Sequence, residues 1–412
     1  MSPSPNDSDA DLHLIVLGNP ENRRVQLFAD AVARRGRAKM ETVAWLDFLQ
    51  DAEALKSRLR PDTVLRIESP GENFEVERLL LLQGSEARTD NDHEWMSRDA
   101  IKRLEFRRGR VLPMPQWFRG WERALQAVEA SLAAVPGCRA MNSPREIATM
   151  CDKALCHRFL GYYDVPVPPL LGTPGSFAEL RALMSGRNCH RIFLKPWYGS
   201  SASGVVALEM SATAMQAFSS VELVREQGAL HLYNSLEIRR YSTTSEIVEL
   251  IDAVCRQRCI AEVWLPKAGF EGRRFDLRGL VIAGRAAHAV VRQSQGPMTN
   301  LHLGNQRGDL ARLREHLGEA NWQRATTACE RAAAAFPNSL YVAVDLLVSP
   351  SFRRVAVAEV NAFGDLLPNV LHEGRDTYSA ELAALDESDG ATDSSKAPGF
   401  TMDDNRWRCF RK

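Results

Sequence analysis

A lysine followed by a glycine-rich segment is the part of this sequence with the clearest chemical meaning. Lys195 precedes the segment Gly199–Gly204, and hydrophobic, β-like runs flank the two. Glycines can adopt positive φ, and the small residues between them let main-chain N–H groups approach phosphate oxygens closely. A Walker loop is excluded, because in that motif the glycines precede the lysine and a helix follows. Taken alone, the segment fits a phosphate-binding loop between two strands or an ordinary turn.

Two runs rich in β-branched residues, 341–348 and 355–361, predict a hairpin that carries oxygen ligands. Asp345 lies among apolar neighbours in the first run, while Glu359 and Asn361 share one face of the second. Carboxylates within apolar strands are costly unless a cation neutralises them, and hard oxygen ligands suit Mg²⁺ held jointly by protein and phosphates. The alternative is a pair of buried acids neutralised by arginines. Three inward oxygens on an apolar hairpin favour the metal.

The order of further motifs along the chain makes this interpretation more specific. The ordered set is Lys153, Lys195 with its glycine loop, the segment 262–265, Asp276-Leu277-Arg278, Arg292, Asn300, Asp345 and Glu359-Val360-Asn361. This order resembles that of the ATP-grasp superfamily over roughly residues 142–371. Within the superfamily, the sequence is most similar to the ligases that add glutamate to a ribosomal protein and to glutathione synthetase.

The resemblance implies ATP and Mg²⁺ as cofactors, with two metal ions for which Mn²⁺ can substitute. Lys153 would reach the α-phosphate and Lys195 the α- and β-phosphates. The loop that closes over the triphosphate would be Gly199, Ser200, Ser201, Ala202, Ser203 and Gly204. The interlobe hinge, whose backbone bonds the adenine edge, would be Glu262, Val263, Trp264 and Leu265. The alternatives are a solvated helix lysine for Lys153 and a core residue for Trp264.

The resemblance also implies three catalytic residues, in addition to the metal ligands Asp345, Glu359 and Asn361. Arg292 would stabilise charge on the transferred γ-phosphoryl group, and a surface salt bridge is its alternative. Asn300 would be an active-site asparagine, whereas the nearby His302 is better explained as a structural histidine. Arg278 would hold the acceptor carboxylate, although an ion pair with Asp276 explains it nearly as well.

The sequence departs from the family pattern in three places. The usual hinge pattern is replaced by Ala261-Glu262-Val263-Trp264, and the glycine loop carries Ser200-Ser201-Ala202 where relatives often have bulkier residues. After Asn361 the chain continues with the segment 362–368, in place of small residues, proline and glycine. Because that segment borders the substrate in relatives, this departure concerns the acceptor more than ATP.

The first 140 residues predict a small α/β domain. Strands are expected at 12–17, 42–45 and 63–67, with a helix at 22–35, and this alternation indicates a parallel sheet. Ligands gather beyond the carboxyl ends of such strands, so Gly18-Asn19 and the segment 66–71 are candidate rim loops.

An aromatic cluster, Trp117, Phe118 and Trp121, precedes a helix expected at 122–134. It is better explained by packing than by a ligand cage. A further helix, which carries Lys153, is expected at 144–160.

The predicted fold class is α/β, a two-lobed α+β ATP-grasp domain preceded by a small N-terminal α/β domain with a parallel sheet. The expected domains are 1–136 for the N-terminal part and 137–385 for the ATP-grasp part, with an N lobe at about 137–262 and a C lobe at about 263–385. The segment 386–412 is expected to be a flexible tail, although Trp407, Cys409 and Phe410 near its end could dock back.

Composition limits the location and the partners. The formal net charge of +0 over 412 residues argues against nucleic acid, although the basic run 102–110 could bind an acidic partner. The eight cysteines lack CxxC pairs, which disfavours zinc and fits a reduced, cytoplasmic protein. Neither a signal pattern nor an apolar run of spanning length is present, so secretion and membrane insertion are not expected. The sequence does not decide whether the chain forms a homo-oligomer.

The resemblance predicts an enzyme, an ATP-dependent carboxylate–amine ligase. Such a ligase forms an amide or peptide bond through an acylphosphate and releases ADP and phosphate. Its partners would be ATP and a carboxylate and an amine from small molecules, amino acids or peptides, which the sequence does not identify. A kinase-like phosphoryl transferase and a catalytically silent nucleotide-binding protein are the alternatives.

Overall fold

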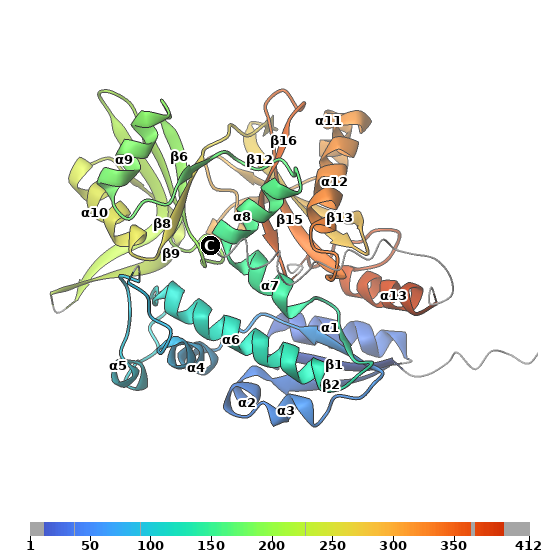
Figure 1. The fold of residues 1–412 in the computed structure, drawn as a ribbon. Coiled ribbons are helices and arrows are strands. Elements are labelled where there is room, and N and C mark those ends of the chain that lie inside the picture. Colours follow the sequence, from blue (N-terminus) through green and yellow to red (C-terminus); the bar gives the residue numbers. More distant parts are fainter. Residues whose placement is uncertain (1–11, 37, 91, 227, 364–366, 391–412) are drawn as a thin grey trace, which may run out of the picture.

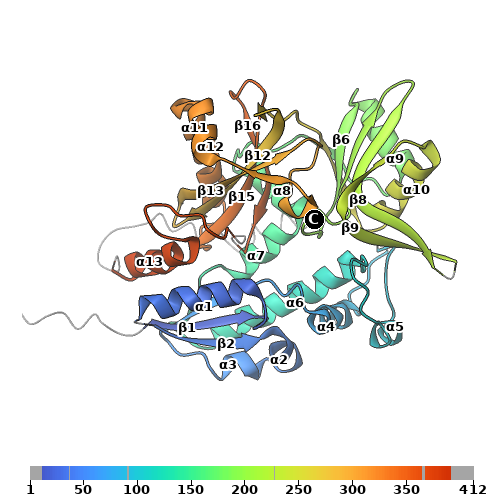
Figure 2. The same ribbon diagram turned by 180° about the vertical axis from the view of Figure 1, so that it is seen from behind.

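Three β-sheets with helices on their faces make up the molecule. The computed structural model describes residues 12–36, 38–90, 92–226, 228–363 and 367–390. The first sheet belongs to the N-terminal part, and two six-stranded sheets follow it in the chain. In both views, these two larger sheets stand side by side over the N-terminal part (Figure 1, Figure 2).

The N-terminal sheet is entirely parallel, in the order β2-β1-β3-β4. Its strands are β1 (Leu12–Gly18), β2 (Ala38–Ala44), β3 (Thr63–Ile67) and β4 (Arg139–Ala140). The helices of this part are α1 (Arg23–Arg35), α2 (Trp45–Gln50), α3 (Glu53–Lys56), α4 (Phe74–Gly84), α5 (Arg98–Lys102) and α6 (Met114–Ala133). The predicted parallel α/β arrangement is confirmed.

Two local predictions in this part are wrong. Trp45 begins α2 and does not end a strand, because its side chain turns into the core, where its indole N–H donates to the Glu68 carbonyl at 2.9 Å. The helix expected at 122–134 begins earlier, at Met114, with Pro113 as its N-cap residue. The aromatic cluster therefore lies inside α6. Trp121 is fully buried and stacks on Trp117, in agreement with a packing role.

The second sheet is antiparallel and contains the glycine loop. Its order is β5-β10-β6-β7-β8-β9. The strands are β5 (Leu170–Gly172), β6 (Arg191–Pro196), β7 (Val206–Met210), β8 (Met215–Glu226), β9 (Ala229–Tyr241) and β10 (Cys259–Val263). Two helices, α9 (Phe177–Gly186) and α10 (Thr244–Cys255), pack on one face. The glycine loop connects β6 to β7, so the predicted strand, loop, strand arrangement is confirmed.

The third sheet is also antiparallel and contains the acidic hairpin. Its order is β14-β13-β12-β15-β16. The strands are β11 (Gly269–Phe270), which pairs with β12, β12 (Arg273–Ile282), β13 (Arg285–Ser294), β14 (Gln306–Gly308), β15 (Tyr341–Val348) and β16 (Val355–Asn361). The helical segments are η1 (Leu301–Leu303), α11 (Leu310–Leu317) and α12 (Glu319–Ala334). The hairpin strands begin and end where the sequence predicted.

The helix expected at 144–160 is in fact two helices. They are α7 (Pro144–Cys151) and α8 (Lys153–Tyr162), and Asp152 separates them with an extended backbone. The Asp152 carboxylate accepts the Leu155 N–H at 2.9 Å and so caps α8. The break therefore places Lys153 at the first position of a new helix.

The last described helix, α13 (Thr377–Gly390), packs beside α1 of the N-terminal part (Figure 2). Residues 386–390 are thus helical, contrary to the expected tail, whereas the expectations for 391–412, including Trp407, Cys409 and Phe410, lie outside the described residues.

A buried arginine cluster anchors α13. Arg66 pairs with Glu68 at 2.7 Å and with Glu381 of α13, and all three side chains are almost completely buried. The rings of Phe28, Tyr341 and Tyr378 surround its guanidinium, with centroids 4.3, 4.7 and 5.2 Å away.

No helix in the described ranges combines the length and the apolar character that crossing a membrane requires.

Candidate functional site

A cavity of about 90 Å³ lies between the second and third sheets. Both lobes contribute to it, because the β6–β10 side of the second sheet faces the β12–β15–β16 side of the third. The predicted site residues that line it are Lys153, Lys195, Gly199, Ala202, Glu262, Val263, Leu265, Arg292, Asn300, Asp345 and Glu359. The other predicted residues are not among its lining residues: Ser200, Ser201, Ser203, Gly204, Trp264, Arg278 and Asn361. The fold thus brings together residues as far apart in the sequence as Lys153 and Glu359.

Lys153 extends from the start of α8 across the cavity to the third sheet. Its Nζ lies 2.8 Å from Glu359 Oε1 and also donates to the Gly199 carbonyl. Burial lowers the pKa of Lys153, but the Glu359 carboxylate outweighs burial and raises it overall. In turn, burial raises the pKa of Glu359, and Lys153 outweighs that effect and holds it below its ordinary value. Lys153 is therefore a paired cavity residue and not a solvated helix lysine.

Lys195 forms a second cation–carboxylate pair inside the cavity. Its Nζ lies 2.5 Å from Glu262 Oε2 and 3.4 Å from the Ala358 carbonyl. Register explains the first contact, because Lys195 lies on β6 opposite Ile260 of β10, two residues before Glu262. Both side chains are mostly buried.

The predicted hinge segment lies at the end of β10, but two of its N–H groups already have partners. The Val263 N–H donates to Pro169 at 2.9 Å, and the Trp264 N–H donates to Arg191 at 3.0 Å. Trp264 packs against Phe193, with ring centroids 5.3 Å apart, outside the cavity lining. The core interpretation of Trp264 therefore fits better than a direct ligand role.

Two arginines from adjacent strands hold Asp345. Arg278 donates two hydrogen bonds to its carboxylate, at 2.6 and 2.8 Å, and Arg292 Nη2 lies 3.1 Å from Oδ2. Register explains the convergence, because Arg278 on β12 pairs directly with Asp345 on β15. All three side chains are buried.

Asp276 forms the centre of a neighbouring network that sequence reasoning missed as a site. It accepts from Arg292 Nε at 2.7 Å, from Lys267 Nζ at 3.1 Å and from the Thr299 hydroxyl. Burial would raise the pKa of Asp276, but Arg292 and Lys267 outweigh it and hold the pKa well below its ordinary value. Burial, with Arg292 nearby, lowers the pKa of Lys267 despite Asp276.

The sequence held only part of the signal for this network. Asp276 belongs to the motif Asp276-Leu277-Arg278, but the family resemblance gives a role in this motif to Arg278 alone. Lys267 and Thr299 carry no spacing signal, because loops and not strand alternation bring them to Asp276.

The hairpin places the predicted metal ligands on adjoining strand positions. Asp345 pairs directly with Glu359 across β15 and β16, and a bulge follows Asp345. Like charges opposite each other are destabilising unless cations intervene, and here Lys153, Arg278 and Arg292 do so. Asn361 pairs with Ala343, and its amide nitrogen is buried without a hydrogen-bond partner among the described residues.

A metal ion at these donors would have to replace the cations that now hold them, because both Asp345 oxygens accept from Arg278 and Glu359 pairs with Lys153. Two carboxylates and an amide are hard donors, and phosphates would supply further oxygens. Within the described ranges, no group of three or more His, Cys, Asp or Glu side chains is placed to hold a metal ion.

The glycine loop adopts the backbone conformation that its small residues permit. Gly204 has φ of 71°, and a Cβ atom there would lie 2.6 Å from Pro196 Cγ. Ser201 and Ala202 also have positive φ, of 50° and 60°, although neither is glycine.

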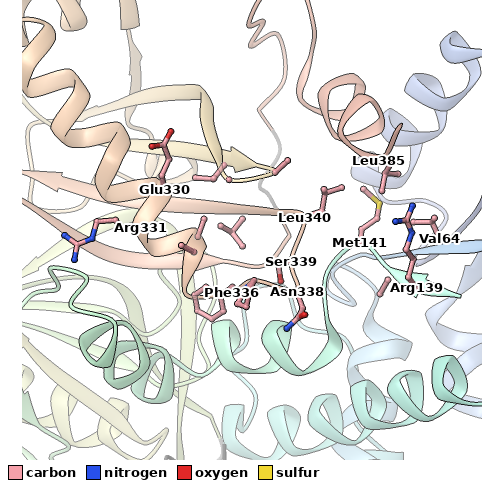
Figure 3. Close-up of a pocket in the computed structure, with 18 of the residues that line it drawn as sticks. Val64, Arg139, Met141, Glu330, Arg331, Phe336, Asn338, Ser339, Leu340 and Leu385 are labelled. Atoms are coloured by element: carbon pink, nitrogen blue, oxygen red, sulfur yellow. The ribbon is translucent and has the colours of Figure 1, made fainter. Parts of the chain in front are cut away.

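A larger cavity of about 690 Å³ lies elsewhere, between α12, the start of β15 and β4 (Figure 3). Figure 3 shows Glu330 and Arg331 on one side of it and Arg139 on the other. Two of its charged side chains bond backbone groups of the fold. Glu330 accepts the Ala286 N–H at 3.2 Å, and Arg331 donates to the Asp164 carbonyl at 2.8 Å. We therefore place the candidate site in the smaller cavity, where unlike charges converge from both lobes.

Comparison with known proteins supports the fold. No protein-family model and no curated protein matches the chain. Among solved structures, it is similar to a D-cycloserine synthetase, with 14% identity and a TM-score of 0.52 over 91% of this chain and 99% of that one. It is also similar to an N5-carboxyaminoimidazole synthase from Aspergillus clavatus, solved with ADP, with 11% identity and a TM-score of 0.52 over 91% and 77% of the two chains. These structures are ATP-grasp ligases, and this chain has the ATP-grasp fold that the order of its motifs predicted.

Proposed function

We propose that this chain is an ATP-dependent carboxylate–amine ligase that works through an acylphosphate. The observation that carries the proposal is the single cavity in which Lys153, Lys195 and the glycine loop face Asp345 and Glu359. The second and third sheets, which come from separate parts of the chain, each contribute one side of this cavity. Nucleotide phosphates and divalent cations together match this mixture of cations and carboxylates.

The reaction would occur in two steps. A carboxylate oxygen of the first substrate attacks the γ-phosphorus, and the bond to the ADP oxygen breaks. An amine nitrogen of the second substrate then attacks the acyl carbon and loses a proton, while phosphate leaves. No protein nucleophile is required in either step, so the chain needs no Ser-His-Asp or Cys-His arrangement.

The chain's own residues would bind and orient the reactants. Lys153 and Lys195 would exchange their carboxylate partners for phosphate oxygens, and Arg292 would face the transferred phosphoryl group from the third sheet. Asp345, Glu359 and Asn361 would hold Mg²⁺, two ions in our proposal, which would neutralise phosphate charge when bound. The glycine loop would exclude water and so protect the acylphosphate.

The finer assignments are also proposals. We place the chain nearest the glutamate-adding and glutathione-forming ligases because of its motif order. We propose a cytoplasmic location, an amino acid or peptide among the substrates, and the domain limits 1–136 and 137–385. The segment after β16, which departs from the family pattern, is where the acceptor specificity would differ.

Calorimetric titration with a non-hydrolysable ATP analogue tests the proposal. We expect binding that requires Mg²⁺ and that weakens at least about tenfold in Glu359→Gln, because the variant loses a charged metal ligand. Glu246→Gln, an exposed glutamate on α10, is the matched control and should bind like the wild type.

The outcomes separate the proposal from its alternatives. ADP release that depends on both a carboxylate and an amine supports the ligase. A stable phosphorylated product from a hydroxyl acceptor would indicate a phosphoryl transferase instead. Absence of nucleotide binding by well-folded protein would contradict the nucleotide site altogether.

A further inference from the structure

Three polar side chains of the β8–β9 hairpin hold the glycine loop from outside the cavity. The Ser219 hydroxyl donates at 2.8 Å to the carbonyl of Val205, the residue directly after the loop, and the Ser220 hydroxyl donates to the Ala202 carbonyl at 3.4 Å. Asn234 makes two contacts, since its amide nitrogen donates to the Ser203 hydroxyl at 2.5 Å and its amide oxygen accepts the Gly204 N–H at 3.3 Å. Together these contacts reach most of the C-terminal half of the loop.

A β-bulge explains why consecutive residues of β8 both reach the loop. Side chains normally alternate between the two faces of a strand. The register between β8 and β9 shifts between Ser219 and Val221, and the next pair is Val221 with Asn234. Bulges re-aim side chains next to functional sites, and here the bulge brings Ser220 toward the same loop as Ser219.

The loop needs external support because of its own conformation. Ser201 and Ala202 are non-glycine residues with positive φ, and Gly204 follows with φ of 71°. Such conformations persist only where surrounding contacts determine them. The contacts to Ala202, Ser203 and Gly204 therefore fall on the strained part of the loop or directly beside it.

The N-terminal part of the chain holds Asn234 in turn. The Asn234 N–H donates to the Gly109 carbonyl at 2.7 Å. Gly109 has φ of 77°, and a Cβ atom there would lie 2.6 Å from the Asn234 carbonyl oxygen. Directly before the loop, Tyr198 stacks on Phe118 of α6, with ring centroids 4.1 Å apart and planes 12° apart. The N-terminal part thus contacts the residue directly before the loop and, through Asn234, the loop itself.

We propose that Asn234 is the residue that positions the glycine loop for the nucleotide, and that it couples the segment around Gly109 to that loop. The proposal rests on the proposed nucleotide function. Asn234 touches the loop and not the cavity, so it is a positioning residue. An amide suits the task because one side chain offers both the donor for Ser203 and the acceptor for Gly204.

Hydrogen exchange of the loop amides in the nucleotide-free protein is the first test. In Asn234→Ala, we expect the Gly204 amide and its neighbours to exchange about three- to tenfold faster, because one modest hydrogen bond to that amide is lost. Ser203→Ala removes part of the same contact from the other side and should show a smaller increase. Ser235→Ala is the matched control, since its hydroxyl accepts the Glu237 N–H on the same strand.

Nucleotide binding and steady-state kinetics form the second test. We expect Asn234→Ala to raise the Kd and the KM for ATP about three- to tenfold, with little change in kcat. A general structural defect would instead lower the active fraction and leave KM unchanged. Gly109→Ala should shift loop exchange in the same direction, which tests the coupling.

The two tests fail in different ways. If wild-type protein binds no nucleotide, the proposed function fails, while the exchange experiment still decides whether Asn234 holds the loop. Wild-type exchange and wild-type ATP affinity in Asn234→Ala would overturn the positioning role. Unchanged exchange in a folded Gly109→Ala variant would overturn the coupling.

Discussion

Two buried arginine networks in this molecule differ in their balance of charge. In the cavity network, Asp276 and Asp345 share the three cations Lys267, Arg278 and Arg292. In the α13 network, Glu68 and Glu381 both pair with one cation, Arg66. The cavity network carries surplus positive charge, whereas the α13 network carries surplus negative charge.

The surroundings of each network match its balance. Aromatic rings enclose Arg66 on several sides, so the surplus charge there has to be removed within the protein. Burial raises the pKa of Glu381 to about 7 although Arg66 lowers it, and protonation therefore removes the excess near neutral pH. In the cavity network, Lys267, Asp276, Arg292 and Asp345 line a cavity of about 90 Å³. A surplus of buried cations beside a cavity thus indicates a ligand site, whereas an enclosed and proton-balanced network indicates a structural role.

Replacing Arg292 should produce the largest effect and separate function from stability. We expect Arg292→Ala to lower kcat at least about 10³-fold, because in the proposed reaction Arg292 would face the transferred charge. Folding should be affected less, since Lys267 and Arg278 still neutralise the two aspartates. Steady-state kinetics and urea unfolding measure the two effects. Arg285→Ala, exposed at the start of the same strand, is the control. A loss confined to KM would contradict the assigned role.

Replacing Arg66 should have the opposite pattern of effects, a large loss of stability with little change in nucleotide binding. Arg66→Met leaves Glu68 and Glu381 buried without their cation, and we expect a loss of about 3–5 kcal/mol in the free energy of unfolding. Nucleotide affinity of the folded protein should stay within twofold or so of the wild type, as the cluster lies outside the cavity. Arg60→Met, at an exposed position just before β3, is the matched control. Wild-type stability in Arg66→Met would remove the structural role.

The smallest expected effect concerns pH. The folded pKa of Glu381, about 7, lies above its ordinary value of 4.5, so the folded state binds the proton more tightly than the unfolded state does. This contribution to stability is complete below pH 4.5 and is lost as pH rises through 7. Glu381→Gln should remove about 2 kcal/mol of this dependence between pH 5 and 8. Urea unfolding at both pH values measures it, with Glu387→Gln of the same helix as control. Equal pH dependence in both variants would sink the assignment.

Much of the fold could be predicted because its signals are local. Strand alternation located the β15–β16 hairpin and β3 to the residue, and the glycine loop marked the turn between β6 and β7. The errors arose where one residue changed the local structure. Asp152 interrupts a continuous apolar pattern by capping the next helix, and that competition between side chain and backbone is not visible in periodicity.

The site was less predictable than the fold, since its contacts are set by register and by loops. The pairing of Arg278 with Asp345 follows from the alignment of β12 with β15, which no local pattern specifies, whereas the alternative partner Asp276 lies only two residues away. Lys267 and Asn234 were missed for the same reason. Lys267 contacts Asp276 nine residues later through a loop, and Asn234 contacts Ser203 31 residues earlier, and neither separation follows the period of a helix or a strand.

The ion pair between Lys153 and Glu359 has a thermodynamic consequence. If Glu359 binds a metal and Lys153 binds a phosphate, each group must first release the other. Once one ligand has broken this ion pair, the other ligand would bind without the free-energy cost of breaking it. Metal and nucleotide would therefore each raise the affinity for the other by the same factor. The pair would therefore make the site respond to the metal–nucleotide complex more strongly than to either component alone. A single contact across the cavity would thus set the cooperativity of the two ligands.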